Sequence, residues 1–124
     1  MSRGRAAAVA VAGLRIAYGA ALVLAPASTG SKWIGRDGRR PGTGVALRAL
    51  GAREVALHAG AAAAAVRGEP VRPWFLASML GDFTDMVATA AAAGEVPDDA
   101  PMKTFAVAGG SALLSGVLVA ALDR

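Results

Sequence analysis

Four apolar segments of roughly 20 residues each constrain the fold of this chain more than any motif does. They cover residues 6–25, 43–66, 73–93 and 104–122, and short polar or charged connections separate them. A helix of roughly 20 residues, rising about 1.5 Å per residue, covers the hydrocarbon core of a bilayer, which is about 30 Å thick. Each segment is therefore long enough to form one transmembrane helix.

The first and fourth segments argue against a water-soluble helical domain. A surface helix needs a polar face, yet residues 6–25 carry a single charge, Arg15, and residues 104–122 carry none. A chain of 124 residues cannot bury two such helices completely. We therefore predict one all-α domain over residues 1–124, a four-helix transmembrane bundle with up-down-up-down topology.

The composition narrows the classes of partner. Hydrophobic residues make up 55% of the chain but aromatic residues only 5%, so small side chains dominate and favour close helix–helix contacts. The absence of Cys excludes disulfides and thiolate ligands. The net charge of +4 comes from termini and connections rather than from one helix face, so we expect membrane lipids and not nucleic acid as partners. No phosphate-binding Gly-rich loop or nucleophile elbow is present, and no cofactor is predicted.

The connections suggest where the helices begin and end. Pro26 is expected to end the first helix, Pro73 to lie in the first turn of the third, and Gly94 to stop it. The longest connection, 27–42, is basic and carries Trp33 beside a lysine, a combination typical of the membrane–water interface.

The N-terminus has a second interpretation. Arg3 and Arg5, an apolar run and Ala25-Pro26-Ala27 imitate a cleaved signal peptide, but Arg15 interrupts that run, so we favour an uncleaved first span. Five Lys or Arg residues would flank each side of the membrane, so their count does not decide the orientation. The arginines before the first helix favour a multi-pass protein of the cell membrane with both termini in the cytoplasm.

Ionisable residues lie inside three of the four segments, where an isolated charge is costly. Arg15, Glu54 and Asp82 each fall near the middle of a segment and so at a similar depth. The set balances three positive against three negative charges and comprises Arg15, Arg48, Arg53, Glu54, Asp82 and Asp85, with His58 beside them. A common depth and opposite signs predict mutual pairing inside the bundle.

Helical spacing predicts which of these side chains share a face. The pairs are Glu54 with His58, Asp82 with Asp85, and Arg15 with Tyr18. Gly51 leaves room beside Arg48 and Glu54 for a neighbouring helix or a ligand. Arg53 points about 140° away from Arg48 and must reach a different neighbour.

Two interpretations of the cluster stay open. It is either a set of ionic ties that fixes helix register, or the lining of a cavity where an acid, a base or a polar ligand acts. A buried ion pair is weak evidence for net stability, and six charges with a histidine exceed what register requires. Asp82 and Asp85 resemble paired carboxylates for acid–base chemistry. The alternative is that each of them simply forms an ion pair with an arginine. His58 is the only histidine and has no recognised ligand spacing, so no metal site is predicted.

Small residues recur every four positions on two segments, a pattern that lets helices approach closely. They are Ala56, Gly60 and Ala64 in the second segment and Ala108, Ala112, Gly116 and Ala120 in the fourth. Internal packing is the favoured interpretation, and a homodimer seam is the alternative.

Two motifs carry a resemblance to a known group of proteins. Arg48-Ala-Leu-Gly-Ala-Arg-Glu54 and the later Gly81-Asp82-Phe-Thr-Asp85 make the chain resemble a family of small uncharacterised four-helix bacterial membrane proteins, and more loosely the DoxX-like membrane families. The resemblance implies a multi-pass membrane protein and transfers no catalytic residue.

The sequence favours an accessory or binding module of the membrane over an enzyme. A proton-coupled small-molecule transporter and a membrane enzyme with Asp/Glu acid–base chemistry on a lipophilic substrate are the alternatives. A scaffold predicts that every charge is paired and that no cavity is present. An enzyme predicts a closed cavity that reaches the cluster and at least one carboxylate that no arginine satisfies. A transporter predicts proton-coupled flux that Glu54→Gln removes.

Overall fold

The computed structural model describes residues 1–122 and is entirely helical, which confirms the all-α prediction. Five α-helices and one short 3-10 helix follow one another, and no strand occurs within the described residues. Their bounds are α1 Arg3–Leu24, α2 Pro26–Ile34, η1 Gly35–Arg39, α3 Pro41–Arg67, α4 Arg72–Ala91 and α5 Ala100–Leu122.

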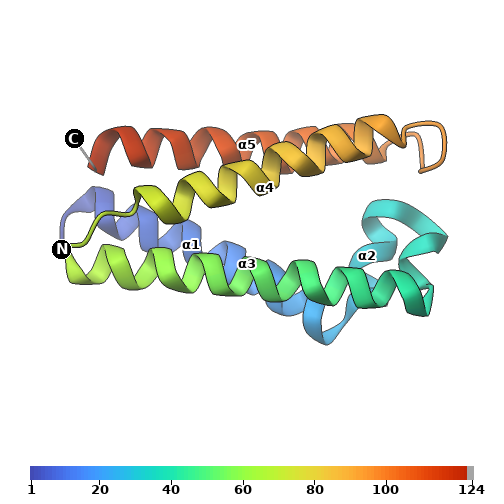
Figure 1. The fold of residues 1–124 in the computed structure, drawn as a ribbon, viewed down its shortest axis with the longest axis horizontal. Coiled ribbons are helices and arrows are strands. Elements are labelled where there is room, and N and C mark those ends of the chain that lie inside the picture. The colour runs from blue at the N-terminus through green and yellow to red at the C-terminus, as the bar shows by residue number, and fades with distance from the viewer. Residues whose placement is uncertain (123–124) are drawn as a thin grey trace.

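The four long helices run side by side along the long axis of the molecule and alternate in direction (Figure 1). Helix α1 packs mainly against α3, and α4 mainly against α5. The described end of α5 lies at the end of the molecule where α1 begins. We call this the terminal end, and the opposite end, where α2 lies, the α2 end.

The connection predicted over residues 27–42 is itself helical, which corrects the expectation of an irregular loop. Pro26 is the first residue of α2, a position where the missing N–H of proline costs nothing. Gly35 then ends α2 with a φ of +70°, a conformation that suits glycine. From the sequence we expected Pro26 to end α1, but we did not expect it to begin a further helix, α2.

The other helix ends follow ordinary capping chemistry. Gly68 ends α3 in the left-handed conformation, and the Glu69 N–H bonds back to the Ala64 carbonyl at 2.9 Å. Arg5 donates to the Ala64, Ala65 and Glu69 carbonyls and so ties α1 to the same helix end. Helix α4 ends at Ala91, before the predicted glycine stop.

Helices α1 and α3 touch backbone to backbone at Gly19 and Gly51. A Cβ atom built on Gly51 would lie 2.5 Å from the Gly19 carbonyl oxygen, and one built on Gly19 would lie 2.6 Å from the Gly51 oxygen. Real Cβ atoms do not come so close, so both positions require glycine for this crossing. The space predicted beside Gly51 is therefore filled by a neighbouring helix.

The apolar core lies toward the terminal end. It joins the first turns of α1, the last turns of α3, the start of α4 and the end of α5, and most of its members are small: Ala8, Ala12, Ala61, Ala64, Ala65, Val71, Phe75, Leu118 and Val119. Phe75 is its largest fully buried side chain. Gly60 and Gly116, from the two predicted small-residue stripes, lie against Trp74 and Met79 of α4.

Two helices, Arg3–Leu24 and Ala100–Leu122, are long and apolar enough to cross a membrane by length and composition. Only 22% of the most apolar window of each is buried inside the protein. Helices α3 and α4, with 27 and 20 residues, do not meet the same test of composition. The composition test therefore supports membrane association through α1 and α5.

Candidate ligand-binding cavity

Arg15 joins all four long helices through one guanidinium group. From α1, its Nε donates to Glu54 Oε2 of α3 at 2.8 Å, and its Nη2 donates to Asp82 Oδ1 of α4 at 2.8 Å. Its Nη1 donates to the Ser111 hydroxyl of α5. Every guanidinium nitrogen of Arg15 therefore has a protein partner.

His58 is held by two further bonds beside this hub. Its Nδ1 lies 2.7 Å from the Glu54 carbonyl oxygen, which can only accept, so Nδ1 carries the proton. Its Nε2 lies 3.0 Å from the Ser78 hydroxyl of α4, which donates to it when the ring is neutral. Both ring nitrogens are satisfied and the residue is 1% exposed, so His58 ties α3 to α4.

The two aspartates of α4 are left incompletely paired. Asp82 is 1% exposed, and its Oδ2 has no hydrogen-bond partner although Oδ1 is bonded to Arg15. Within residues 1–122, no hydrogen bond or ion pair reaches the Asp85 carboxylate. Buried carboxylate oxygens are normally satisfied, so this end of the cluster is open to a further group.

Two of the predicted arginines lie outside the hub. Arg53 Nη2 is 4.0 Å from Glu54 Oε1 and lies over Gly81 of α4 with 45% of its side chain exposed. Arg48 is exposed, and its Nε donates to the Val23 carbonyl at 3.2 Å. Helix ends leave carbonyls without helical partners, and the end of α1 draws Arg48 away from the cluster. The predicted charge balance therefore does not describe the bonded hub, which holds one arginine and two carboxylates.

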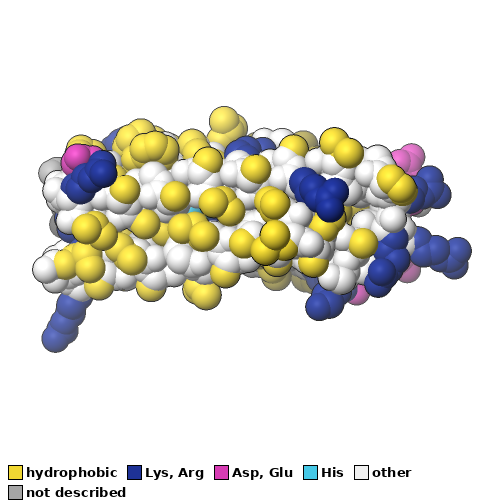
Figure 2. Space-filling model, turned by 90° about the horizontal axis from the view of Figure 1, so that it is seen from below, with side chains coloured by type: hydrophobic (Ala, Val, Ile, Leu, Met, Phe, Trp, Pro, Cys, Tyr) yellow, Lys and Arg dark blue, Asp and Glu magenta, His cyan; other side chains and the backbone are white. Residues whose placement is uncertain are grey.

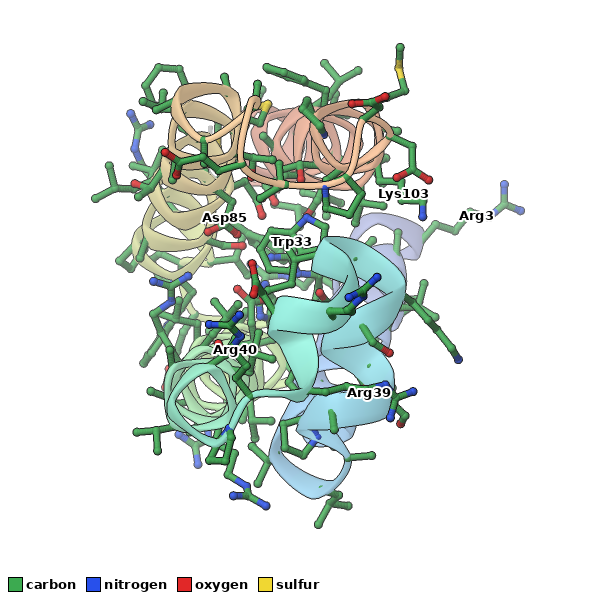
Figure 3. The ribbon with its side chains drawn as sticks, turned by 90° about the vertical axis from the view of Figure 1, so that its right-hand side faces the viewer. Arg3, Trp33, Arg39, Arg40, Asp85 and Lys103 are labelled. Carbon is green, nitrogen blue, oxygen red and sulfur yellow. The ribbon has the colours of Figure 1, made fainter. Side chains whose placement is uncertain are left out.

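A cavity of about 480 Å³ reaches this hub from the α2 end. Its charged and aromatic lining includes Arg15, Tyr18, Trp33, Glu54, Asp82 and Asp85, and its apolar lining includes Leu14, Leu50, Val107 and Ala108. Seen along the long axis, Asp85 and Trp33 point toward the space between the helices, whereas Arg3 points away from the molecule (Figure 3). Tyr18 lines the cavity together with Arg15, its predicted neighbour on α1.

Helix α2 closes the α2 end of the cavity through contacts with α5. Trp33 Nε1 donates to the Thr104 hydroxyl at 2.7 Å. Lys103 Nζ donates to the Lys32 carbonyl at 3.0 Å and lies 2.8 Å from Asp99 Oδ2. The hydrogen bond from Lys103 lowers the pKa of the Asp99 carboxyl. The Lys103 ammonium group is thus engaged by a carbonyl and a carboxylate where α2 meets α5.

Sequence reasoning missed three hydroxyls of the site, which belong to Ser78, Thr104 and Ser111. Single hydroxyls within apolar helices give no hydropathy signal, because such groups also bond to their own helix backbone. Ser111 does lie near the middle of its helix, at the depth predicted for the charges.

No group of three or more His, Cys, Asp or Glu side chains within residues 1–122 is arranged to hold a metal ion. No protein-family model matches the chain, and no curated protein or solved structure shows significant similarity to it.

Proposed function

We propose that this protein is a small integral membrane protein whose four long helices cross the bilayer and whose cavity binds a lipophilic small molecule. It would act as a binding or accessory module of the cell membrane. The observation that carries the proposal is the cavity that ends on a buried, incompletely paired acidic cluster.

The distribution of side chains supports a lipid surrounding. The interior holds Glu54, His58 and Asp82, each at most 2% exposed, whereas Phe83 and Leu113 are 61% and 71% exposed. A soluble protein places these classes of side chain the other way round. On the face seen in Figure 2, many Lys and Arg side chains lie at the two ends and a few lie nearer the middle, where hydrophobic side chains are spread among white backbone and other side chains.

The helix lengths support four spans. Helices α1, α3, α4 and α5 have 22, 27, 20 and 23 residues, which is enough for a hydrocarbon core of about 30 Å. Composition singles out α1 and α5 alone because α3 and α4 carry acidic groups. Glu54 and Asp82 are turned inward to Arg15, so they do not meet lipid.

The cavity is open to molecules dissolved in the bilayer. Leu14 of α1 and Val107 of α5 line it and are also 74% and 65% exposed on the outer surface. The cavity wall therefore continues into the apolar exterior between these two helices. A lipophilic molecule can enter from the side without crossing the basic ends.

Cysteine labelling tests the number of spans, because the chain contains no native Cys. Single variants Ser2→Cys, Ser28→Cys, Glu69→Cys and Asp98→Cys place a thiol on exposed residues at the two ends. With four spans, an impermeant maleimide labels Ser2→Cys and Glu69→Cys from one side of the membrane and the other two from the opposite side. If only α1 and α5 cross, Glu69→Cys is labelled together with Asp98→Cys, and the four-span arrangement is wrong.

A membrane enzyme is the second candidate function, and the unpaired Asp85 carboxylate beside a cavity favours it. Such a group is placed to exchange a proton with a bound lipophilic substrate. An enzyme predicts that the bound molecule is chemically changed, whereas a binding module releases it intact. Mass spectrometry of the recovered ligand distinguishes the two. The resemblance to DoxX-like families stays a prediction.

A further inference from the structure

We propose that the cavity selects a lipophilic cation, a protonated amine on an apolar body, with the Asp85 carboxylate as its ion-pair partner and Asp82 Oδ2 as a second acceptor. This inference rests on the proposed binding function and names the chemical class of the ligand.

The inner end of the cavity has an excess of acid. Glu54, Asp82 and Asp85 line it beside Arg15, whereas the other two basic lining residues, Lys32 and Lys103, belong to α2 and to the first turn of α5. Arg15 bonds to Glu54 and Asp82 together, and among residues 1–122 no basic group lies within hydrogen-bonding distance of Asp85. An ionised carboxylate in a half-buried, largely apolar site is costly without a hydrogen-bonding partner. The charge of Arg53 acts on Asp85 from farther away, so a cationic ligand in direct contact would stabilise this carboxylate further.

Arg15 offers an anionic ligand no free nitrogen. The three nitrogens of Arg15 are used by Glu54, Asp82 and Ser111. At the rim, Lys103 is engaged by Asp99 and by a backbone carbonyl. A carboxylate or phosphate beside the hub would therefore face the three carboxylates without gaining a hydrogen bond from Arg15, and like charges at such distances repel.

The order of groups along the cavity fits an ammonium with an apolar tail. Helix α4 runs toward the α2 end, so Asp85 lies about 4.5 Å nearer that end than Asp82. Along the cavity from Trp33 inward, Asp85 therefore comes before the Arg15 hub. Tyr18 and Trp33 supply aromatic groups beside this path, which attract cations. The apolar body of the ligand would pack against the leucine and valine side chains that line the cavity.

Quenching of Trp33 fluorescence tests the inference. The chain has two tryptophans, and Trp74→Phe leaves Trp33, which lines the cavity, as the only one. The protein is placed in neutral-lipid nanodiscs and titrated with para-bromobenzylamine, para-bromobenzyl alcohol or para-bromobenzoate, which share one bromoaryl quencher. We expect the amine to bind about tenfold or more tightly than the alcohol, and the benzoate least tightly, as a charge-assisted hydrogen bond predicts.

Matched variants show whether Asp85 is responsible. Asp85→Asn should weaken amine binding about tenfold and leave the alcohol unchanged, whereas Asp85→Glu should retain the preference. Asp98→Asn makes the same change of charge on an exposed residue outside the cavity and should alter neither. Equal binding of amine and alcohol, or an unchanged preference in Asp85→Asn, overturns the cation inference but keeps a binding cavity. Absence of saturable quenching by all three compounds overturns the binding function itself.

Discussion

The two ends of this protein are built differently from the same small residues. At the terminal end, Ala8, Ala12, Ala61 and Ala65 pack around Phe75 with no side-chain charge among them. In the half nearer the α2 end, the cavity separates the helices and directional bonds from Arg15 and Trp33 join them. The core of the terminal end is closed by apolar contact, whereas hydrogen bonds between side chains span the cavity in the other half.

The difference matters because lipid gives helices little hydrophobic reason to associate. Helices in a membrane are held together by close packing of small residues and by hydrogen bonds between helices. The terminal end relies mainly on the first means. The half with the cavity adds the second to the close Gly19–Gly51 crossing of α1 and α3. A site that must admit a ligand cannot be packed tightly, so its rigidity has to come from polar ties around an open space.

Removing the Arg15 side chain from the hub should have the largest effect on the stability of the protein. Arg15→Met leaves Glu54 and Asp82 buried without their cation, and breaking a buried ion pair in this way costs about 3–5 kcal/mol. Thermal unfolding in detergent would show a large fall in stability. Combining Arg15→Met with Glu54→Gln and Asp82→Asn removes the stranded charges and should recover part of the loss. An equal fall in the triple variant would mean that charge compensation is not the role of Arg15.

Truncating one large side chain in each half should show, from the loss in unfolding free energy, which half is tightly packed and which contains open space. Phe75 is fully buried, so Phe75→Ala leaves a void in a closed core and should cost about 3 kcal/mol. Leu50 already borders the cavity and is half-buried, so Leu50→Ala should cost less than about 1.5 kcal/mol. The same unfolding measurement checks both. Equal losses would show that the cavity half is packed as tightly as the terminal end.

At the α1–α3 crossing, two Gly→Ala substitutions on the same helix should have smaller effects on stability, but effects of opposite sign. Gly51→Ala places a methyl group against the Gly19 backbone and should cost about 1–3 kcal/mol through overpacking. Gly44→Ala, also on α3, meets nothing within 4 Å and should instead gain about 0.5–1 kcal/mol of helix stability. Opposite signs in the two unfolding midpoints are expected. A stabilising Gly51→Ala would contradict the close approach of the two backbones.

Much of the fold follows from the apolar runs, but the contacts around the site do not. The depth argument placed Arg15, Glu54 and Asp82 at one level, and the structure brings these three together. Helical phase gives a side chain's direction on its own helix and does not say which neighbour stands there. For that reason the sequence did not place Arg48 at the end of α1 or Arg53 over Gly81.

Helix α2 was missed for a related reason. Its residues include Pro26, Gly30 and Lys32, which are typical of a connection, and its first and last residues are set by turn chemistry rather than by periodicity. What holds α2 is its docking on α5 through Trp33 and on η1 through the Gly30–Gly38 contact. Such support comes from distant parts of the chain and leaves no local pattern.

The single guanidinium that joins the four long helices also sets an order for biogenesis. Glu54, Asp82 and Ser111 lie 39, 67 and 96 residues after Arg15 in the chain. At about 5–20 residues per second, a ribosome needs several seconds after making Arg15 to deliver Asp82. During that interval the first helix carries a cation without its second carboxylate. In the four-span arrangement that we propose, the insertion of α1 would be completed by helices that are not yet made when it enters the membrane.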